Sequence, residues 1–322
     1  MNIHAPASQA HRFDEQTSAM AQDVVDGLSR QPKQLSPKYF YDAAGSELFE
    51  QITRLPEYYP TRTELGILRK QASEIAGKAP SGAALVEFGA GATTKARLLL
   101  NQQAFSAYVP VDISADFLAS QASVLRRDFP RLQVHPVAAD FTASFTLPEV
   151  VRTLPKVGFF PGSTIGNFEP YEACAFLRRA RGLLGPNAQM IVGVDLEKDE
   201  RVLHAAYNDA AGVTACFNLN LLVRINRELG GNFDLGAFTH RAIYNHERHR
   251  IEMHLISVKA QTVRLLGRNV SFRHGESIHT ENSYKYSVER FTALVRGASW
   301  RVLKSWTDDE MMFSVHTLVG SD

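Results

Sequence analysis

The sequence predicts an α/β fold built around a doubly wound, mostly parallel sheet, and three observations lead to this prediction. Short apolar runs and helical patterns alternate from residue 83 to residue 196, which is typical of strands joined by crossover helices. The first apolar run ends in a glycine turn that leads into a helical pattern. After residue 195 the alternation stops, and the last two strand patterns, at 300–306 and 312–319, predict an antiparallel hairpin that completes the sheet.

The alternating region predicts five parallel strands, at 84–88, 108–112, 133–137, 157–161 and 189–195. The helices that accompany them lie near 94–102, 115–128 and 170–184. Gly185-Pro186 closes the last helix, because glycine is common just beyond a helix and proline cannot continue it. Open parallel sheets bind ligands beyond the carboxyl ends of their strands. The residues that fall at those ends are Gly89, Asp112, Asp140 and Gly162.

The segments on either side of this region have other patterns. Residues 1–12 are expected to form a loose terminus, and a helical pattern then runs to near Pro32. Residues 37–64 are dense in aromatic side chains without a regular period, and Thr61-x-x-Glu64 resembles a capping box at the start of the next helix. Residues 199–229 look helical, and 286–296 resume a helix after strand patterns at 241–244, 250–257, 262–265 and 269–272. We infer that 199–285 is an insertion made before the sheet is complete.

Composition excludes several classes of partner. The chain has 322 residues, of which 44% are hydrophobic, and 35 basic residues balance 34 acidic ones. This balance gives no electrostatic footprint for nucleic acid or an anionic membrane. No signal peptide is evident, and no apolar run approaches the ~18 residues of a membrane span. We therefore expect a cytoplasmic protein, a monomer or a weak homo-oligomer, with Cys174 and Cys216 as buried free thiols.

Residues 84–95, Ala-Leu-Val-Glu-Phe-Gly-Ala-Gly-Ala-Thr-Thr-Lys, are the most informative segment. An apolar strand, a turn on Gly89 and Gly91 and the start of a helix form a backbone site for a nucleotide-bearing cofactor. Asp112, 23 residues after Gly89, ends the next strand and can accept hydrogen bonds from both ribose hydroxyls. Thr94 stands where a dinucleotide-binding turn would need a third glycine. The segment therefore favours S-adenosylmethionine over NAD and leaves NAD as the alternative.

Seven further sequence blocks follow one another in order from about residue 35. They are Lys38-Tyr-Phe-Tyr-Asp42, Gly45-Ser-Glu-Leu-Phe49, Leu55-Pro-Glu-Tyr-Tyr-Pro-Thr-Arg62, Pro161-Gly-Ser-Thr-Ile-Gly-Asn167, Ala206-Tyr-Asn-Asp-Ala-Ala-Gly212, Arg250-Ile-Glu-Met253 and Thr280-Glu-Asn-Ser283. Because it contains these blocks together with the glycine turn, the chain resembles the S-adenosylmethionine-dependent histidine Nα-methyltransferases of ergothioneine biosynthesis. These enzymes convert L-histidine to its trimethylated betaine, hercynine.

The resemblance implies a fold and a division into domains. The sheet would be the seven-stranded, Rossmann-like sheet of class I methyltransferases. A second, smaller α+β substrate domain would be formed by the N-terminal segment and the insertion. Residues 61–198 and 286–322 would then bind S-adenosylmethionine, and residues 13–60 and 199–285 would form the substrate-binding domain.

The resemblance also implies a role for each site residue. The cofactor shell would comprise Glu87, Gly89, Gly91, Lys95, Asp112, Asp140 and Phe141. The α-amino and carboxylate ends of histidine would be held by Asn167 and Tyr207, with Gly162 close by. The imidazole pocket would comprise Tyr58, Met253, Glu281 and Ser283. Tyr41 and Phe49 would line the methylation site, so the residues expected to serve catalysis are Asn167, Tyr58, Tyr41 and Phe49.

The residue types give these roles a physical reason but leave alternatives open. A carboxylate at 281 and a hydroxyl at 283 on an extended segment point to the same side and could bind both imidazole nitrogens. Aromatic faces suit a permanently cationic product. The side chains of Tyr41, Phe49 and Tyr58 could instead pack together in a small core. Asn167 could face the methyl group, or it could be a helix N-cap.

Two features are not expected to belong to the site. Asn282 stands where well-known members of the family carry an aliphatic residue, and its place between two pocket residues predicts that its side chain points away. Four residues whose side chains can ligate a metal cluster within nine positions, namely His246, His249, Glu252 and His254. Strand alternation separates these side chains onto two faces, so we expect no metal site there.

Other functions remain as alternatives at this stage. The acceptor could be another small amine or amino acid, although hydrophobic residues at 253 and 281 would have favoured an indole more. A catalytically silent scaffold is disfavoured by the intact cofactor residues. A nucleic-acid methyltransferase is disfavoured by the near-zero net charge, and hydride transfer with NAD is disfavoured by Thr94.

Overall fold

The computed structural model describes the backbone of residues 7–321 and the side chains of residues 17–321. The chain forms two compact units. The larger one, the sheet unit, comprises residues 56–203, 245–250 and 282–322. The smaller unit comprises the chain up to residue 55 together with 204–244 and 251–281.

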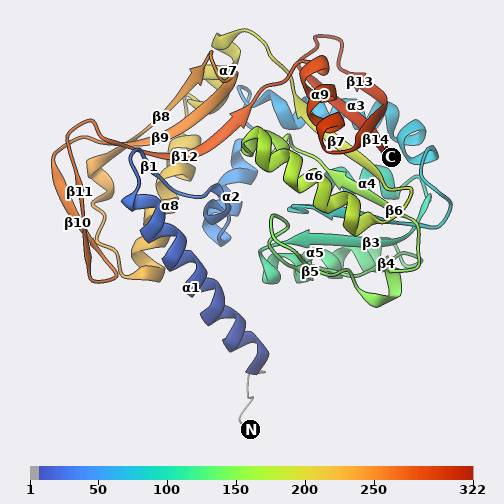
Figure 1. The fold of residues 1–322 in the computed structure, drawn as a ribbon, viewed down its shortest axis with the longest axis horizontal. Coiled ribbons are helices and arrows are strands. Elements are labelled where there is room, and N and C mark those ends of the chain that lie inside the picture. Colours follow the sequence, from blue (N-terminus) through green and yellow to red (C-terminus); the bar gives the residue numbers. More distant parts are fainter. Residues whose placement is uncertain (1–6, 322) are drawn as a thin grey trace. The chain divides into compact units, whose positions relative to one another are not determined.

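The sheet unit contains the predicted α/β sheet (Figure 1). Its strands are β2 (Ala83–Phe88), β3 (Phe105–Asp112), β4 (Gln133–Val134), β5 (Val137–Ala138), β6 (Lys156–Phe160), β7 (Gln189–Asp195), β13 (Trp300–Thr307) and β14 (Phe313–Gly320). They lie in the order β13-β14-β7-β6-β2-β3-β4, and β5 also pairs with β3. The pairing is parallel except for β14, which is antiparallel to both β7 and β13. The predicted parallel sheet and closing hairpin are therefore confirmed. The predicted strand 133–137 is divided into two short strands, β4 and β5, which both pair with β3. Counted as one edge strand, they give the described sheet seven strands across its width.

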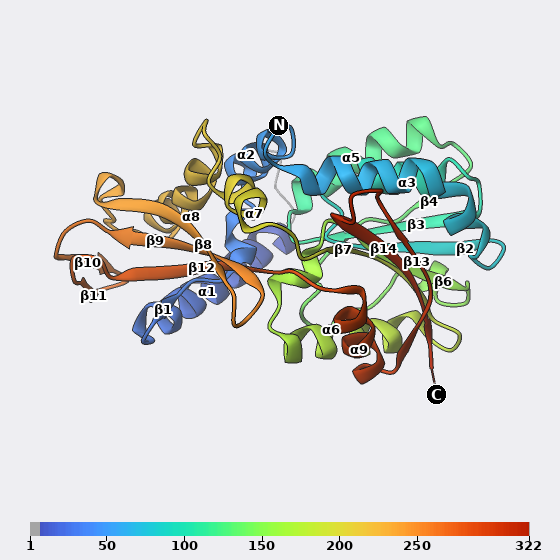
Figure 2. The same cartoon turned by 90° about the horizontal axis from the view of Figure 1, so that it is seen from above.

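Helices cover both faces of this sheet (Figure 2). On one face lie α3 (Tyr59–Gly77), α4 (Thr94–Leu100) and α5 (Ala115–Asp128), and on the other lie α6 (Pro170–Leu184) and α9 (Val288–Gly297). Side chains alternate along each buried strand: Leu85 packs in the cluster with α3, whereas Val86 packs in the cluster with α6. A short 3-10 helix, η2 (Glu149–Val151), precedes β6.

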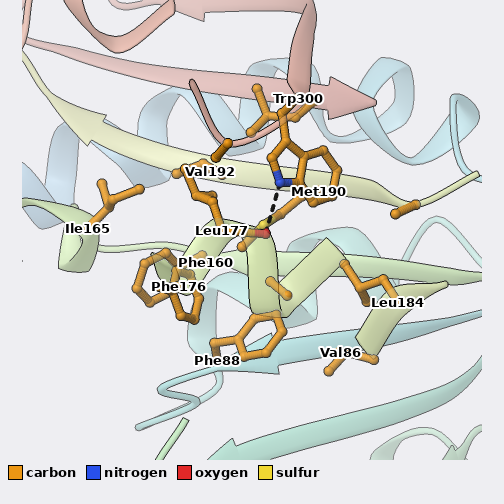
Figure 3. Packing of buried hydrophobic residues seen from close by; sticks show 14 of the residues in the cluster. Val86, Phe88, Phe160, Ile165, Phe176, Leu177, Leu184, Met190, Val192 and Trp300 are labelled. Atoms are coloured by element: carbon orange, nitrogen blue, oxygen red, sulfur yellow. Dashed lines mark hydrogen bonds between the residues drawn. The ribbon is translucent and has the colours of Figure 1, made fainter. Parts of the chain in front are cut away.

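Aromatic rings pack against one another in the cluster between the sheet and α6 (Figure 3). The ring centroids of Phe160 and Phe176 are 4.5 Å apart, and Phe88 meets Phe176 edge-on at 5.3 Å. The buried indole of Trp300 donates from Nε1 to the carbonyl of Leu177 at 3.0 Å. A buried donor without a partner would cost about 1–3 kcal/mol. This bond therefore joins the C-terminal hairpin to the middle of α6.

The smaller unit is built on a second sheet, with strands in the order β1-β12-β9-β8. These strands are β1 (Lys33–Gln34), β12 (Ser277–Tyr284), β9 (Arg250–Ser257) and β8 (Phe238–Asn245), and β10 (Gln261–Leu265) pairs with β11 (Arg268–Phe272) in a separate hairpin. The helices are α1 (Ala7–Ser29), α2 (Ala43–Ile52), α7 (Glu200–Tyr207) and α8 (Val213–Leu229), with 3-10 turns η1 (Pro37–Phe40) and η4 (Leu235–Ala237). The predicted strands at 241–244, 250–257, 262–265 and 269–272 correspond to β8 to β11.

The predicted helix 199–229 is in fact two helices, α7 and α8. Asp209 interrupts it, because its carboxylate accepts hydrogen bonds from the backbone N–H groups of Val213 and Thr214, each at 2.8 Å. Gly212 has a φ of +72°, which turns the chain into α8. The prediction of a loose terminus at 1–12 was wrong for residues 7–12, which belong to α1. Residues 1–6 lie outside the described part of the chain.

Two further expectations concern single features. Cys174 is half-buried and Cys216 is exposed, and both are free thiols, so the expectation of two buried cysteines was wrong. Within residues 7–321 no helix combines the length and the apolar character that crossing a membrane requires.

Candidate functional site

The carboxyl edge of the parallel sheet brings together the glycine turn and Asp112. Gly89 and Gly91 have φ values of +74° and +43°, and the N–H of Gly89 donates to the carbonyl of Val111 at 2.8 Å. The two carboxylate oxygens of Asp112 accept hydrogen bonds from the N–H groups of Gly91, at 3.3 Å, and Ser114, at 3.0 Å. The backbone of the turn therefore fixes the acid that follows it in sequence.

Phe141 covers this turn. A Cβ built on Gly89 would lie 3.4 Å from the Phe141 ring, so the turn and the ring are in contact. The preceding carboxylate, Asp140, accepts a hydrogen bond from the N–H of Thr142 at 2.8 Å. Asp140 and Phe141 thus form a compact turn beside the glycine turn.

Glu87, at the end of β2, is buried and accepts a short hydrogen bond from the hydroxyl of Tyr108 on β3. Burial raises the pKa of Glu87 to about 8, although the Tyr108 hydrogen bond and the charge of Lys95 act in the opposite direction. Glu87 is therefore largely protonated at neutral pH.

Glu64 has a different role from the one its sequence pattern predicts. Helix α3 begins at Tyr59, its N-cap is Tyr58, and Pro60 lies in its first turn, so Thr61-x-x-Glu64 is not a capping box. The carboxylate of Glu64 is instead fully buried. It accepts the N–H of Gly162 at 2.9 and 3.0 Å and pairs with Lys95 Nζ at 2.6 Å. Glu64 thereby ties α3 to the loop after β6.

That loop carries Gly162 and Asn167. Gly162 (φ +80°) and Ser163 (φ +56°) lead into the 3-10 helix η3 (Thr164–Asn167). At Gly166 a Cβ would come 2.8 Å from the backbone oxygen of Tyr284, so only glycine fits between the loop and β12. Asn167 is not a helix N-cap, because α6 is capped by Glu169 through a capping box with Glu172.

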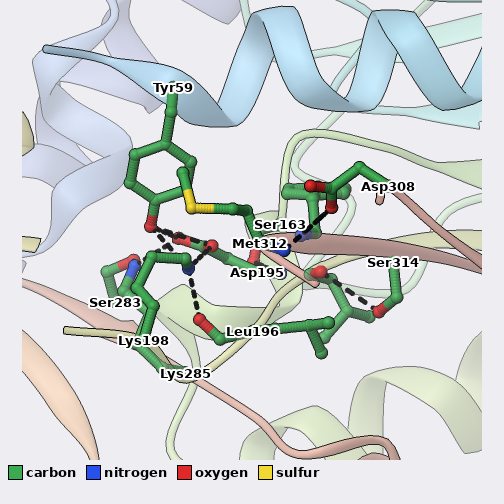
Figure 4. Close-up of polar contacts among 12 residues, drawn as sticks. Tyr59, Ser163, Asp195, Leu196, Lys198, Ser283, Lys285, Asp308, Met312 and Ser314 are labelled. Atoms are coloured by element: carbon green, nitrogen blue, oxygen red, sulfur yellow. Dashed lines mark hydrogen bonds and ion pairs between the residues drawn. The ribbon is translucent and has the colours of Figure 1, made fainter. Parts of the chain in front are cut away.

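A buried polar network lies beside this loop (Figure 4). The carboxylate of Asp195 accepts hydrogen bonds from the Tyr59 hydroxyl at 2.8 and 2.9 Å, from Lys198 Nζ at 2.5 Å and from Lys285 Nζ at 2.8 Å. Burial tends to raise the pKa of Asp195, but the two lysine charges outweigh burial and lower it. Burial also lowers the pKa of Lys198 to about 8. Lys285 additionally donates to Ser283 Oγ at 2.7 Å.

Asn282 belongs to a separate set of contacts. Its side-chain amide donates to Glu169 at 3.3 Å, and the same carboxylate accepts the Tyr284 hydroxyl at 2.6 Å and Arg250 at 2.6 Å. Ser283, by contrast, contacts Lys285. Asn282 therefore points away from its neighbour Ser283, as its position in the sequence predicts.

In the smaller unit, Tyr41 and Phe49 lie in an aromatic group around Phe217. The ring centroids of Tyr41 and Phe49 are 5.7 Å apart, and each is within 5.9 Å of Phe217. Phe217 also stacks on Phe40 at 4.5 Å. These rings form a packed group, and Tyr41 and Phe49 stay partly exposed at its edge.

The remaining predicted residues of the smaller unit lie on α7, β9 and β12. Tyr207 ends α7, and its backbone carbonyl is hydrogen-bonded to the His240 ring at 2.8 Å. Met253 is buried on β9, where its backbone carbonyl accepts the hydroxyl of Thr280 at 3.1 Å. Glu281 lies on β12 and is partly exposed.

Comparison with known proteins identifies the family. Residues 20–319 match the family of histidine-specific, SAM-dependent methyltransferases. The chain is 43% identical to the histidine N-alpha-methyltransferase of Mycolicibacterium smegmatis over 302 residues, which cover 92% of this chain and 93% of the relative. It is 41% identical to the histidine N-alpha-methyltransferase of Mycobacterium tuberculosis, with 90% and 92% covered.

The chain belongs to this methyltransferase family. A fungal relative, ergothioneine biosynthesis protein 1 of Neurospora crassa, is 31% identical over 284 residues. These residues cover 86% of this chain and 32% of the fungal protein, so the matched region makes up about a third of the fungal protein.

The predicted site residues of this methyltransferase are divided between the two units. All seven predicted cofactor residues lie in the sheet unit, together with Tyr58, Gly162, Asn167 and Ser283. The smaller unit carries Tyr41, Phe49, Tyr207, Met253 and Glu281. The boundary between the units falls within β12, between Glu281 and Asn282.

Sequence reasoning gave Glu64 a different role and missed four other buried groups of the methyltransferase's sheet unit, namely Tyr59, Asp195, Lys198 and Lys285. Two of them were close to recognised blocks: Tyr59 lies inside Leu55–Arg62, and Lys285 follows Thr280–Ser283 by two residues. Apart from Asp195 and Lys198, which are three residues apart, the partners are distant in sequence, so no local spacing could have revealed these contacts.

The histidine-rich segment also has an arrangement that sequence alone did not give. His246 contacts Glu200 at 3.0 Å and His249 contacts Glu197 at 2.6 Å, both near the surface. Glu252 and His254 lie together on β9, and His279 of β12 stacks on His254 with ring centroids 4.9 Å apart. Potential ligand atoms of these last three residues lie within 4.8 Å of one another.

Proposed function

We propose that this methyltransferase transfers three methyl groups from S-adenosylmethionine to the α-amino group of L-histidine, giving hercynine in ergothioneine biosynthesis. The observation that carries the proposal is the 43% identity to a histidine N-alpha-methyltransferase across 92% of this chain. The family match over residues 20–319 supports the same cofactor and the same amino acid.

The residues of the sheet unit fit S-adenosylmethionine. The turn at Gly89 and Gly91 has no Cβ to obstruct the cofactor, and the Asp112 carboxylate is already fixed by two backbone N–H groups. Asp112 would accept the ribose hydroxyls, and Asp140 and Phe141 would border the adenine, with Glu87 and Lys95 completing the shell. When bound, the cofactor supplies a methyl group on a positively charged sulfur.

The chain's own task is to orient the amine. In-line transfer needs the neutral nitrogen about 3 Å from the methyl group and aligned with the bond that breaks. We assign this positioning to Asn167 and Tyr207, which would hold the α-amino and carboxylate ends of histidine beside Gly162. The contact of Glu64 with the Gly162 N–H supports this assignment, because it fixes the loop that carries Asn167.

Recognition of the ring is assigned to Tyr58, Met253, Glu281 and Ser283. A pocket that hydrogen-bonds a polar ring rejects apolar analogues, since its own polar groups would otherwise lose their partners. Tyr41 and Phe49 would line the methylation site, where an aromatic face stabilises a quaternary ammonium product by roughly 0.5–2 kcal/mol. We keep monomer or weak homo-oligomer as the predicted assembly.

The test is incubation of the protein with S-adenosylmethionine and a panel of free amino acids that includes histidine, tryptophan and small amines. Mass spectrometry should show that histidine alone gains three methyl groups. Methylation of a different member of the panel would instead support the alternative of another small acceptor. No product with any of them would contradict the proposal.

A further inference from the structure

Asn218, on helix α8, is fully buried, and its side-chain amide contacts three strands of the smaller unit. The amide nitrogen Nδ2 lies 2.8 Å from His240 Nδ1 on β8 and 3.2 Å from the main-chain carbonyl oxygen of His254 on β9. The amide oxygen Oδ1 lies 2.8 Å from the hydroxyl of Thr280 on β12. Since a buried polar group is costly to leave unpaired, these bonds hold α8 against the sheet.

The carbonyl of His254 decides how the amide of Asn218 is oriented. A carbonyl oxygen can only accept a hydrogen bond, so the atom that faces it must be the amide nitrogen. A reversed amide would bring two oxygens together at this contact. The second proton of the same nitrogen points to His240 Nδ1, which therefore accepts and carries no proton. The hydroxyl of Thr280 in turn donates to the amide oxygen.

The proton of the His240 ring accordingly lies on Nε2. This nitrogen is 2.8 Å from the main-chain carbonyl oxygen of Tyr207, which is again an acceptor. Burial lowers the pKa of His240, although the bond to the Tyr207 carbonyl and the charge of Asp209 act in the opposite direction. The ring is therefore neutral at neutral pH and is held in one tautomer, in which Nε2 donates to Tyr207.

The contacts form one directed chain through α8. The hydroxyl of Thr280 donates to the amide, the amide donates to the His240 ring, and the ring donates to the carbonyl of Tyr207. Hydrogen bonds arranged in such a chain polarise and strengthen one another. The hydroxyl of Thr280 also lies 3.1 Å from the carbonyl oxygen of Met253, and Thr280 directly precedes Glu281. The chain thus connects the main chain at the end of α7 with β9 and β12.

The residue after Tyr207 is attached to β8 by separate bonds. Asn208 Oδ1 accepts the N–H of Ala242 at 2.9 Å, and Asn208 Nδ2 donates to the Ala242 carbonyl at 3.1 Å. Ala242 lies two residues beyond His240 on the same strand. Asn208 therefore keeps this segment on β8 without His240, whereas the bond from His240 sets the orientation of the Tyr207 peptide group. Loss of His240 should move Tyr207 without releasing the segment.

We propose that His240, oriented by Asn218, is a positioning residue that holds the main chain of Tyr207 in a fixed place relative to Met253 and Glu281. The inference rests on the proposed function, in which these last three residues, all of the smaller unit, contact the substrate. It adds two residues outside the assigned pocket, and it makes the tautomer of a histidine of the protein part of substrate binding.

The first experiment compares His240→Gln with His240→Asn in steady-state kinetics. The amide nitrogen of glutamine lies about where Nε2 of histidine does and can still donate to Tyr207. Asparagine is one methylene shorter, so it reaches Asn218 but not Tyr207. KM for histidine should stay within about twofold of the wild type in His240→Gln and rise about fivefold in His240→Asn. Affinity for S-adenosylhomocysteine, measured by calorimetry, should be unchanged in both variants.

The matched control is His274→Asn, because His274 is an exposed histidine of the same unit. It should leave KM unchanged. The proposal is overturned if both variants at position 240 have the KM of the wild type, or if His240→Gln is affected as much as His240→Asn or more. The latter result would mean that His240 only satisfies the buried amide of Asn218, a task that asparagine performs better than glutamine.

A second measurement remains decisive if one of the variants does not fold. Nuclear magnetic resonance of protein that contains isotope-labelled histidine distinguishes the two neutral tautomers and the imidazolium form. The signals of His240 are those that disappear in whichever variant folds. At neutral pH the ring should be neutral with its proton on Nε2, and a proton on Nδ1 would refute the directed chain.

Formation of trimethylated histidine by the wild type is measured before the variants are compared. Its absence would contradict the proposed function itself. Normal product formation, with equal KM for histidine in the wild type, His240→Gln and His240→Asn, would contradict only the positioning role of His240.

Discussion

Replacement of Glu64 by glutamine should lower the stability of the sheet unit and loosen the loop that carries Gly162 and Asn167, to which we assign substrate positioning. Glu64 is fully buried in α3, and its two oxygens accept the Gly162 N–H at 2.9 and 3.0 Å. Lys95 Nζ lies 2.6 Å from one of them. A Cβ at Gly193 would lie 2.0 Å from the Glu64 carboxylate, so the acid lies directly against the backbone of β7. Glutamine keeps this shape but not the charge.

The size of the effect follows from these contacts. Hydrogen bonds to charged groups contribute about 1.5–3 kcal/mol, against about 0.5–1.5 kcal/mol for neutral ones. Removing one member of a buried ion pair costs about 3–5 kcal/mol when the remaining charge stays buried. Lys95 keeps 19% of its side chain exposed, so water can partly hydrate it. We therefore expect Glu64→Gln to lower the free energy of unfolding by about 2–3 kcal/mol.

Urea denaturation followed by tryptophan fluorescence measures this loss directly, because Trp300 and Trp306 both lie on β13 of the sheet unit. The value of kcat/KM for histidine should fall as well, since Gly162 belongs to the loop of Asn167. Glu74→Gln is the control on the same helix: Glu74 is a surface carboxylate bonded to Lys304 and Trp306, and its loss should be much smaller. A loss below about 0.5 kcal/mol in Glu64→Gln, with unchanged kcat/KM, would refute the argument.

Three further predictions use other residues of the site. Glu281→Ala should raise KM for histidine strongly while calorimetry shows unchanged cofactor affinity; unaltered histidine kinetics would remove Glu281 from the pocket. Asp112→Ala should weaken S-adenosylmethionine binding by about 1.5–3 kcal/mol, because hydrogen bonds to a charged acceptor are lost, and equal affinity by calorimetry would contradict its role. Glu87 has a folded-state pKa of about 8 against an ordinary 4.5 because it is buried. Between these two pH values the folded state holds a proton on Glu87 that the unfolded state has lost. Protonation of Glu87 therefore stabilises the folded state fully below about pH 4.5, and this stabilisation is lost as pH rises through about 8. Glu87→Gln should remove that decline in urea denaturation measured from pH 5 to pH 9, and identical profiles for variant and wild type would show that Glu87 does not titrate in this range.

The parallel sheet could be predicted from sequence because its strands are buried on both faces. The run Ala83–Phe88 is fully buried, and so is nearly all of Gln189–Asp195, so each appears as a continuous apolar segment. The glycine turn after β2 and Gly185 after α6 then mark where the elements begin and end. The position of Asp112, the proposed cofactor acid, was predictable for the same reason, since it ends a buried strand.

The smaller unit was harder to predict because its strands carry polar side chains. β12 was not predicted as a strand, because Ser277-Ile-His-Thr-Glu-Asn-Ser-Tyr284 has few apolar residues. Glu64 was misassigned because Thr-x-x-Glu is a local signal, whereas its actual partner Gly162 is 98 residues away. The ion pair of Asp195 and Lys285 spans 90 residues and likewise leaves no local pattern.

The close approach at Gly166 has a consequence for which amino acids can serve as acceptors. Main chain meets main chain there, so the distance from the Asn167 loop to the Ser283 strand does not depend on the rotamers of neighbouring side chains. On the proposed assignment, the amine binds at one of these segments and the ring at the other, and the site would then select for side-chain length as well as for ring chemistry. Homohistidine, which has one more methylene between amine and ring, should be a poor acceptor even though its imidazole is identical.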